Sequence, residues 1–185
     1  LKTIAIQGFG NVGSNVALEA YQCAHLDQKV IAVSDRNVTI VHEDGLNIPK
    51  LKQFVAANQG DLPVQEEELT ALNIQGKILP RDAILSLDTD VLFLAALGNQ
   101  IREDNMKSIR AKIIIEGAND PIQKNADEYL SKQGVLIIPD ILANAGGVIV
   151  SYFEWLQGRE TQFYTEEEVY TKLYEKMEKT FLQVF

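Results

Sequence analysis

Residues 3–35 read TIAIQGFGNVGSNVALEAYQCAHLDQKVIAVSD, and this stretch decides the fold. A short β-rich run at residues 3–7 breaks at Gly8, and alanine and leucine then recur with helical spacing over residues 12–25. Residues 29–34 form a nearly continuous apolar run, which suits a strand buried on both faces of a parallel sheet. The stretch therefore predicts a strand, a tight turn, a helix and a second, parallel strand.

The predicted turn reads GFGNVG at residues 8–13, a GxGxxG pattern that closes a strand and opens a helix within a βαβ unit of about 30 residues. Gly8 permits the sharp turn, Gly10 lets the backbone approach a diphosphate, and Gly13 lets the helix pack close to the sheet. Free N–H groups at the start of the helix then face the phosphates. We expect a dinucleotide site here; the alternative is a tight strand–helix turn without a ligand.

Two charged residues follow the second predicted strand. Asp35 stands 22 residues beyond Gly13, where a carboxylate can accept hydrogen bonds from the adenosine ribose hydroxyls and would repel a 2′-phosphate. Arg36 is either a solvated charge or a partner for that phosphate if Asp35 turns away. The pair favours NAD as the cofactor and leaves NADP open.

The second half of the chain alternates strands and helices. Apolar runs at residues 91–96, 112–116 and 134–138 are separated by helical patterns near residues 103–109 and 125–132. Such alternation predicts parallel βαβ units with right-handed crossovers. The expected fold is α/β: a Rossmann-type doubly wound, mostly parallel sheet with helices on both faces.

The segment between the two regular halves is less periodic. Residues 37–87 contain a plausible helix at 48–58 with Pro49 in its first turn, and we interpret the segment as the long connection of a sheet whose strand order reverses. Near the C-terminus, an apolar-aromatic helix is expected over residues 144–156 and a last helix from about Thr165.

Composition narrows the possible partners. The 185 residues carry a net charge of −9 and a pI near 4.7, which oppose nucleic acid and anionic lipid as partners. No apolar run reaches the roughly 18 residues of a membrane span, and no secretory leader pattern opens the chain. With Cys23 as its single cysteine, the chain is expected to be soluble and cytoplasmic. His25 and His42 lack partners at ligand spacing, so no metal site is expected.

Five blocks of the sequence resemble the cofactor domain of the glutamate, leucine, phenylalanine and valine dehydrogenase superfamily. They are IQGFGNVGS, VIAVSD, DVLFLAALGNQI, IIIEGAN and IPDILANAGGVIVSYFEW, and with their spacing they cover nearly the whole chain. The last block is the most specific, and its SYFEW ending resembles glutamate dehydrogenases. The resemblance implies the NAD(P)-binding domain of an enzyme that oxidatively deaminates L-glutamate to 2-oxoglutarate and ammonia.

The same resemblance implies which residues meet the ligands. Asp35 would meet the adenosine ribose, Val148 would pack on the methylenes of glutamate, and Ser151 would contact its side-chain carboxylate. Read without the family, Ser151 is a small helical residue that permits close packing. The cofactor's diphosphate would be held by Gly8, Phe9, Gly10, Asn11, Val12 and Gly13, and its central and nicotinamide parts by Ala95, Ala96, Asn99, Gly117, Asn119 and Asn144.

The chain departs from the family pattern at two positions. Asp120 stands where the family usually has a glycine after EGAN, and Gly98 stands where an acidic residue is expected before Asn99. Backbone freedom is lost at one position and gained at the other. These departures bear on the geometry around Asn99 and Asn119.

The family's catalytic lysine and aspartate lie on a domain that precedes the nucleotide fold, so we expect this chain to be an inactive fragment with no catalytic residue of its own. The expected boundaries are a dinucleotide-binding domain at residues 1–160 and a truncated helical extension at 161–185. The resemblance also implies a homo-oligomer in the complete enzyme. The alternatives are an amino-acid dehydrogenase of the leucine, phenylalanine or valine type, and a non-catalytic dinucleotide-sensing module.

Overall fold

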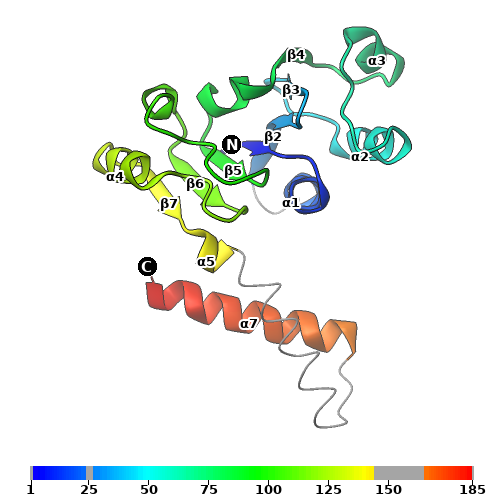
Figure 1. The fold of residues 1–185 in the computed structure, drawn as a ribbon. Helices are drawn as coiled ribbons and strands as arrows, with labels where there is room; N and C mark the ends of the chain where they lie inside the picture. The colour runs from blue at the N-terminus through cyan, green and yellow to red at the C-terminus, as the bar shows by residue number, and fades with distance from the viewer. Residues whose placement is uncertain (1, 24–26, 144–164, 185) are drawn as a thin grey trace. The chain divides into compact units, whose positions relative to one another are not determined.

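The computed structural model describes residues 2–23, 27–143 and 165–184. The chain divides into two compact units, residues 1–137 and residues 138–185, which are described separately. Because residues 144–164 lie outside the described part, the division at residue 160 stays a prediction. Figure 1 labels the elements in chain order. The first unit, with β7 extending one residue past its boundary, holds β1 (Lys2–Gln7), α1 (Asn11–Gln22), β2 (Gln28–Ser34), β3 (Val38–Val41), α2 (Ile48–Ala57), α3 (Glu66–Ala71), β4 (Lys77–Pro80), η1 (Arg81–Ser86), β5 (Val91–Leu94), η2 (Met106–Ser108), β6 (Ile113–Glu116), α4 (Lys124–Lys132) and β7 (Leu136–Ile138).

The strands form one seven-stranded sheet in the order β4-β3-β2-β1-β5-β6-β7. β1 pairs in parallel with β2 on one side and with β5 on the other, and β5 pairs in parallel with β6. The strand order therefore reverses at β1, which is where open α/β sheets leave a crevice beyond their carboxyl ends. The expected Rossmann-type, mostly parallel sheet is confirmed.

Residues 37–87 are more than the long connection that their sequence suggests. The expected helix is present as α2, but β3 and β4 extend the sheet as two antiparallel strands beyond β2. Both strands are four residues long, and their stability comes from pairing with β2 and with each other rather than from a local pattern. Pro80 ends β4 at the edge of the sheet, where a missing N–H costs no ladder hydrogen bond.

A β-bulge in β2 distributes its apolar side chains between the two faces of the sheet. Ile4 pairs with Val30, but the next residue, Ala5, pairs with Ala32, so Ile31 is an extra residue. Val30 consequently packs on one face, while Ile31 and Ala32 both pack on the other.

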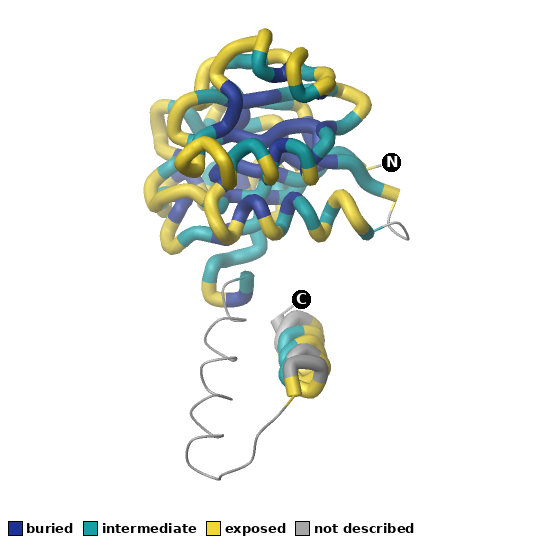
Figure 2. The backbone as a smooth tube through the Cα atoms, turned by 90° about the vertical axis from the view of Figure 1, so that its right-hand side faces the viewer, coloured by how far each residue is buried: buried dark blue, intermediate teal, exposed yellow. Residues whose placement is uncertain are grey.

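Helices cover both faces of the sheet, as expected. One core joins the sheet to α1, α2 and α3, and the other joins it to η1 and α4. β1 and β2, near the middle of the sheet, are the most deeply buried strands, whereas β4 and β7 at its edges contain no buried residue. Figure 2 shows buried segments in dark blue through the middle of the first unit. The helix predicted at residues 125–132 is confirmed as α4.

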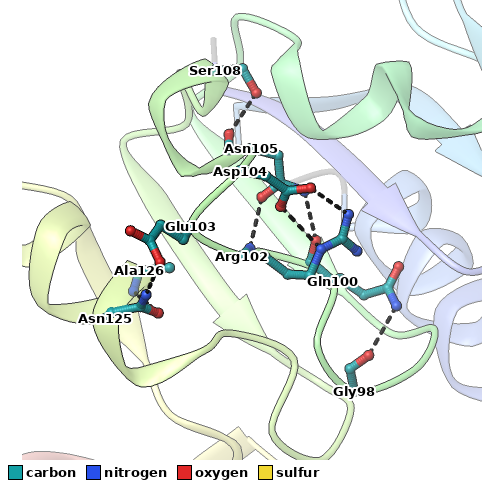
Figure 3. A network of polar contacts seen from close by, with 9 residues as sticks. All are labelled: Gly98, Gln100, Arg102, Glu103, Asp104, Asn105, Ser108, Asn125 and Ala126. Atoms are coloured by element: carbon teal, nitrogen blue, oxygen red, sulfur yellow. Dashed lines mark hydrogen bonds and ion pairs between the residues drawn. The ribbon is translucent and has the colours of Figure 1, made fainter.

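The helix predicted near residues 103–109 is wrong, because only the short 3-10 turn η2 forms there. Asn105 Oδ1 accepts a hydrogen bond from the Arg102 amide at 2.7 Å, and Asn105 Nδ2 donates to the Gln100 carbonyl at 2.9 Å. Figure 3 shows this local network. Such side-chain bonds to the backbone compete with a regular helix.

In the second unit, α5 (Asp140–Ala143) is followed, after the segment outside the described residues, by α7 (Glu166–Val184), which confirms the helix expected from about Thr165. A capping box starts α7: Glu168 Oε2 accepts from the Thr165 amide at 2.8 Å, and the Glu168 amide donates to Thr165 Oγ1 at 3.3 Å. Val169, Leu173 and Met177 are half-buried along one stripe of this helix.

Asp90 connects three strands at their amino ends, on the opposite side of the sheet from the crevice at their carboxyl ends. Its carboxylate accepts hydrogen bonds from the Thr3 amide at 2.9 Å and from Lys112 Nζ at 2.6 Å, so it joins β1 and the start of β6 to the start of β5. The bond from Lys112, followed by the bond from the Thr3 amide, lowers the pKa of Asp90 from 3.8 to about 2.

This pKa predicts a specific loss of stability in acid. A carboxyl group with a lowered pKa in the folded state stabilises the fold above its unfolded pKa, and this contribution is lost as pH falls from about 4 to about 2. Asp90→Asn lacks the contribution at every pH. We therefore expect thermal unfolding followed by circular dichroism to give a lower midpoint for the variant at pH 6, with the difference shrinking between pH 4 and pH 2.5.

Asp88→Asn, which changes an exposed carboxylate two residues away, is the matched control and should follow the wild type through the acid range. Parallel midpoint curves for wild type and Asp90→Asn would contradict the role given to Asp90.

Candidate functional site

A hollow of about 520 Å³ opens beyond the carboxyl ends of β1, β2 and β5. Its volume lies in the range of small-molecule sites, roughly 300–1,000 Å³. The loops that follow α2 and β5, together with η1, complete its walls. The lining residues are Gln7, Gly8, Phe9, Gly10, Asp35, Arg36, Gln59, Gly60, Asp61, Arg81, Asp82, Leu85, Ala95, Ala96, Leu97, Gln100, Arg102 and Asn105.

The glycines of the β1–α1 turn divide into two kinds. A Cβ at Gly13 would lie 1.7 Å from the Gly8 carbonyl oxygen, and a Cβ at Gly8, whose φ is +91°, would lie 2.6 Å from the Ala95 carbonyl oxygen. A Cβ at Gly10 would meet nothing within 4 Å. Gly8 and Gly13 are therefore required by the fold itself, whereas the absence of a side chain at Gly10 keeps space open on the hollow.

The start of α1 suits an anion. Gly10 is the N-cap residue, no side chain caps the helix, and its first turn holds no acidic residue. The first N–H groups of a helix have no partner within the helix, and together with the helix dipole they attract negative charge. Asn11, Val12 and Gly13 all belong to this first turn; Asn11 and Val12 are exposed, and Gly13 is buried.

Asp35 lines the hollow, but its carboxylate also organises the backbone. Oδ1 accepts from the amides of Asn37 at 2.7 Å and Val38 at 2.9 Å, and Oδ2 accepts from the Leu62 amide at 2.8 Å. One side chain thus anchors the β2–β3 turn and the loop between α2 and α3. A carboxylate has about four acceptor positions, so capacity for a further donor remains.

Arg36 forms an ion pair that its sequence position did not indicate. Its Nε and Nη2 donate to the two carboxylate oxygens of Asp61 at 2.8 and 2.9 Å. The hydrogen bond and charge of Asp61 raise the pKa of Arg36, and the bond from Arg36 lowers the pKa of Asp61. The guanidinium therefore stays charged, with its charge balanced by a specific partner.

The residues that were expected to contact the cofactor after β5 and β6 fall into two groups, because some line the hollow and others do not. Ala95 and Ala96 line the hollow, and the Ala95 amide donates to the Gln7 carbonyl at 2.7 Å. Asn99, Gly117 and Asn119 lie outside this lining set. Gly117 has a packing role, because a Cβ there would lie 2.3 Å from the ring of Phe93.

The two departures from the family pattern meet in space. The Asn99 amide donates to the Asp120 carbonyl at 2.9 Å, and a Cβ at Gly98 would lie 3.2 Å from the Asn119 carbonyl oxygen. Asn99 and Asp120 both have positive φ, +55° and +46°. Asn and Asp tolerate this left-handed region better than other side chains, which explains how Asp120 occupies a position that suits glycine.

Gln7 and Gln100 are site residues that the motif analysis missed. Gln7 is only 4% exposed, and its Nε2 donates to Gln100 Oε1 at 2.8 Å. Within the described residues, Gln7 Oε1 and Ser34 Oγ are buried without a hydrogen-bond partner. The sequence did carry a signal for Gln7 and Ser34, because polar residues that end strands such as β1 and β2 border the crevice of such a sheet.

Three expected ligand contacts, Asn144, Val148 and Ser151, lie outside the described residues and stay predictions. Across residues 2–23, 27–143 and 165–184, no group of three or more His, Cys, Asp and Glu side chains could hold a metal ion. In the same described ranges, no helix has the length and apolar character needed to cross a membrane.

The contact between Gly13 and Gly8 leads to a prediction about stability. Gly13→Ala places a methyl group against a backbone carbonyl that cannot move independently of β1, so we expect a loss of roughly 2–3 kcal/mol in unfolding free energy. Urea unfolding followed by circular dichroism measures the loss. Gly10→Ala is the matched control: it adds no close contact and should lose only the smaller amount, roughly 0.5–1 kcal/mol, that separates glycine from alanine at an N-cap. Equal losses in the two variants would show that the close contact is unimportant.

Comparison with known proteins places this geometry in context. A sequence profile described as Glutamate/Leucine/Phenylalanine/Valine dehydrogenase matches residues 1–185. The chain is 40% identical over 175 residues to the NADP-specific glutamate dehydrogenase of Synechocystis sp., covering 95% of this chain and 40% of that protein. It is 38% identical over 182 residues to the NAD-specific glutamate dehydrogenase of Staphylococcus aureus, covering 98% and 41%.

Solved structures agree with the sequence comparison. The hetero-hexameric glutamate dehydrogenase from Thermus thermophilus, in its Leu-bound form, superposes with a TM-score of 0.82 at 28% identity, over 96% of this chain and 39% of that one. The chain thus spans about two fifths of the length of the curated relatives it matches.

Proposed function

The chain belongs to the Glutamate/Leucine/Phenylalanine/Valine dehydrogenase family, and from that premise we propose that its first unit is the nicotinamide-dinucleotide-binding domain of a glutamate dehydrogenase. The complete enzyme would oxidatively deaminate L-glutamate to 2-oxoglutarate and ammonia. The names of the relatives from Synechocystis and Staphylococcus aureus support this substrate.

The observation that carries the proposal is the open space at Gly10. Gly8 and Gly13 are explained by packing alone, but Gly10 has a φ of −76° and no neighbour that a side chain would touch. Nothing in the described fold requires glycine there. A diphosphate lying against the start of α1 does require it, because a Cβ would occupy the space that the phosphate oxygens need.

The residues of the hollow fit the cofactor. The amides at the start of α1 would bind the diphosphate, Asp35 would accept hydrogen bonds from the adenosine ribose, and Ala95 and Ala96 would lie along the central part of the molecule. When bound, the nicotinamide cofactor supplies the acceptor for the hydride that leaves the substrate. This domain contributes binding and orientation, which set the position of the reacting ring.

Further contacts are proposed from the family resemblance. Asn99, Gly117, Asn119 and Asn144 would approach the nicotinamide half of the cofactor, and Val148 with Ser151 would meet glutamate. We also propose that the complete enzyme is an oligomer of identical subunits. The relative from Thermus thermophilus is a hetero-hexamer, which supports an assembly of several subunits but not the identity of those subunits.

NAD is the cofactor that the charges around the ribose end favour. The relatives include both NAD-specific and NADP-specific enzymes, so family membership leaves the choice open. In this chain a carboxylate, Asp35, stands at the end of β2, and the adjacent Arg36 is paired with Asp61. The local charge therefore disfavours a 2′-phosphate.

Gly10→Ala tests the proposed function in the full-length protein. We expect the variant to stay folded, with at most the small loss of stability that alanine causes at an N-cap, but to bind NADH at least about tenfold more weakly, a loss of roughly 1.4 kcal/mol in binding free energy. Fluorescence titration with NADH measures the affinity, and glutamate-dependent formation of NADH measures the activity.

Glu19→Ala, an exposed change on the same helix, should leave both measurements unchanged. Wild-type affinity in Gly10→Ala would refute the proposed diphosphate position. Activity with leucine or phenylalanine in place of glutamate would refute the proposed substrate.

A further inference from the structure

Asp61 is a charged residue of the hollow that neither the glycine motif nor the strand-end rule identifies. It comes from the loop after α2, yet its carboxylate contacts Arg36, the residue next to Asp35. Its side chain is 32% exposed, against 72% for Arg36. The better-fixed partner of this ion pair is therefore the carboxylate.

The loop holds Asp61 firmly in this position. The Gly60 amide donates to the Val55 carbonyl at 3.0 Å, which is the long bond of a Schellman cap at the end of α2, and Gln59 and Gly60 have φ of +57° and +89°. The Asp61 amide then donates to the Asn58 carbonyl at 3.1 Å. The turn thus fixes the backbone from which the carboxylate projects.

Two further bonds connect this loop to the end of β2. Asn37 Nδ2 donates to Asp61 Oδ1 at 3.1 Å, and the Leu62 amide donates to Asp35 Oδ2 at 2.8 Å. Asp35, Arg36 and Asp61 therefore form one connected group at the ribose end of the hollow, with two negative charges and one positive charge.

We propose that Asp61 determines cofactor selectivity: by holding the guanidinium of Arg36, it denies that cation to a 2′-phosphate and maintains the preference for NAD over NADP. The proposal rests on the proposed function and adds to it a positioning residue outside the motif. A 2′-phosphate carries roughly two negative charges at neutral pH. It would meet a site whose net charge is already negative, and whose cation has both Nε and Nη2 bound to another carboxylate.

The other arginines of the hollow are also paired, but on different loops. Arg81 pairs with Asp82 at 3.0 Å after β4, and Arg102 pairs with Asp104 at 3.1 Å after β5. β5 lies on the opposite side of β1 from β2. Asp104 is therefore a carboxylate paired with another arginine that lines the hollow, and because it lies outside the lining set and away from Asp35, it provides a matched control.

The test measures the affinities of NADH and NADPH in the full-length protein by fluorescence titration. Asp61→Asn removes the negative charge, so Arg36 is no longer neutralised. We therefore expect the variant to bind NADPH at least about tenfold more tightly than the wild type does, whereas its affinity for NADH should change by less than about twofold. Asp61→Ala also removes the hydrogen-bond acceptor and should give at least the same gain. The ion pair is exposed, so both variants should fold.

The double variant Asp61→Asn/Arg36→Gln separates this role from a merely structural one. If Asp61 acts through Arg36, the gain in NADPH affinity disappears in the double variant, whereas a loosened loop would give the same effect with or without the guanidinium. Asp104→Asn should leave the ratio of the two affinities at its wild-type value. Competition by 2′,5′-ADP against 5′-AMP should show the same pattern, because these probes differ in the 2′-phosphate.

The outcomes distinguish this proposal from the proposed function. If the wild type binds neither NADH nor NADPH, the proposed function fails and the role of Asp61 fails with it. If the wild type prefers NADH but the Asp61 variants keep its affinity ratio, or if the gain persists without Arg36, the role of Asp61 is overturned while the proposed function stands.

Discussion

The contact between the backbone of Gly13 and that of Gly8 is the constraint on which the rest of the structure depends. It seats the start of α1 directly on the end of β1, closer than any side chain would allow. Gly8 in turn lies against the backbone of Ala95 at the end of β5. Through these two contacts the start of α1, the end of β1 and the end of β5 are packed backbone against backbone. The hollow lies next to them because the strand order reverses at β1.

The charged walls of the hollow come from loops and from the start of η1, and their charges are balanced in pairs. Arg36, Arg81 and Arg102 each contact a carboxylate. Exposed pairs of this kind contribute little to stability, because water and salt screen their attraction. Their effect is on the electrostatic potential that a ligand meets, because a paired arginine attracts an anion less than a free one. The start of α1, without an acidic residue in its first turn, is then the favourable position for negative charge.

The sequence was sufficient where local pattern and tertiary structure agree. The runs ending at Gln7 and Ser34, the glycine turn and the helix after it were all predictable, because buried parallel strands and tight turns leave strong signals. β3 and β4 were not, since Val38–Val41 and Lys77–Pro80 acquire strand structure only by pairing. Asp35 was predicted as a ligand contact, but its three backbone amides were unforeseen, because Leu62 reaches it only after α2 folds back. Asp61 could not be predicted either, because it too reaches the end of β2 only after α2 has folded back.

The bonding of Asp35 has a consequence for how the cofactor preference of such a domain can evolve. Its carboxylate anchors two loops through three amides, and each such hydrogen bond contributes about 0.5–1.5 kcal/mol. A substitution at this position would therefore destabilise both loops in addition to any effect on cofactor selectivity. Mutational drift is tolerated more readily at an exposed loop residue that bonds to side chains than at a strand end that bonds to backbone. Under the proposed role of Asp61, whose carboxylate bonds to the side chains of Arg36 and Asn37, a change of cofactor preference would disturb the backbone less at Asp61 than at Asp35.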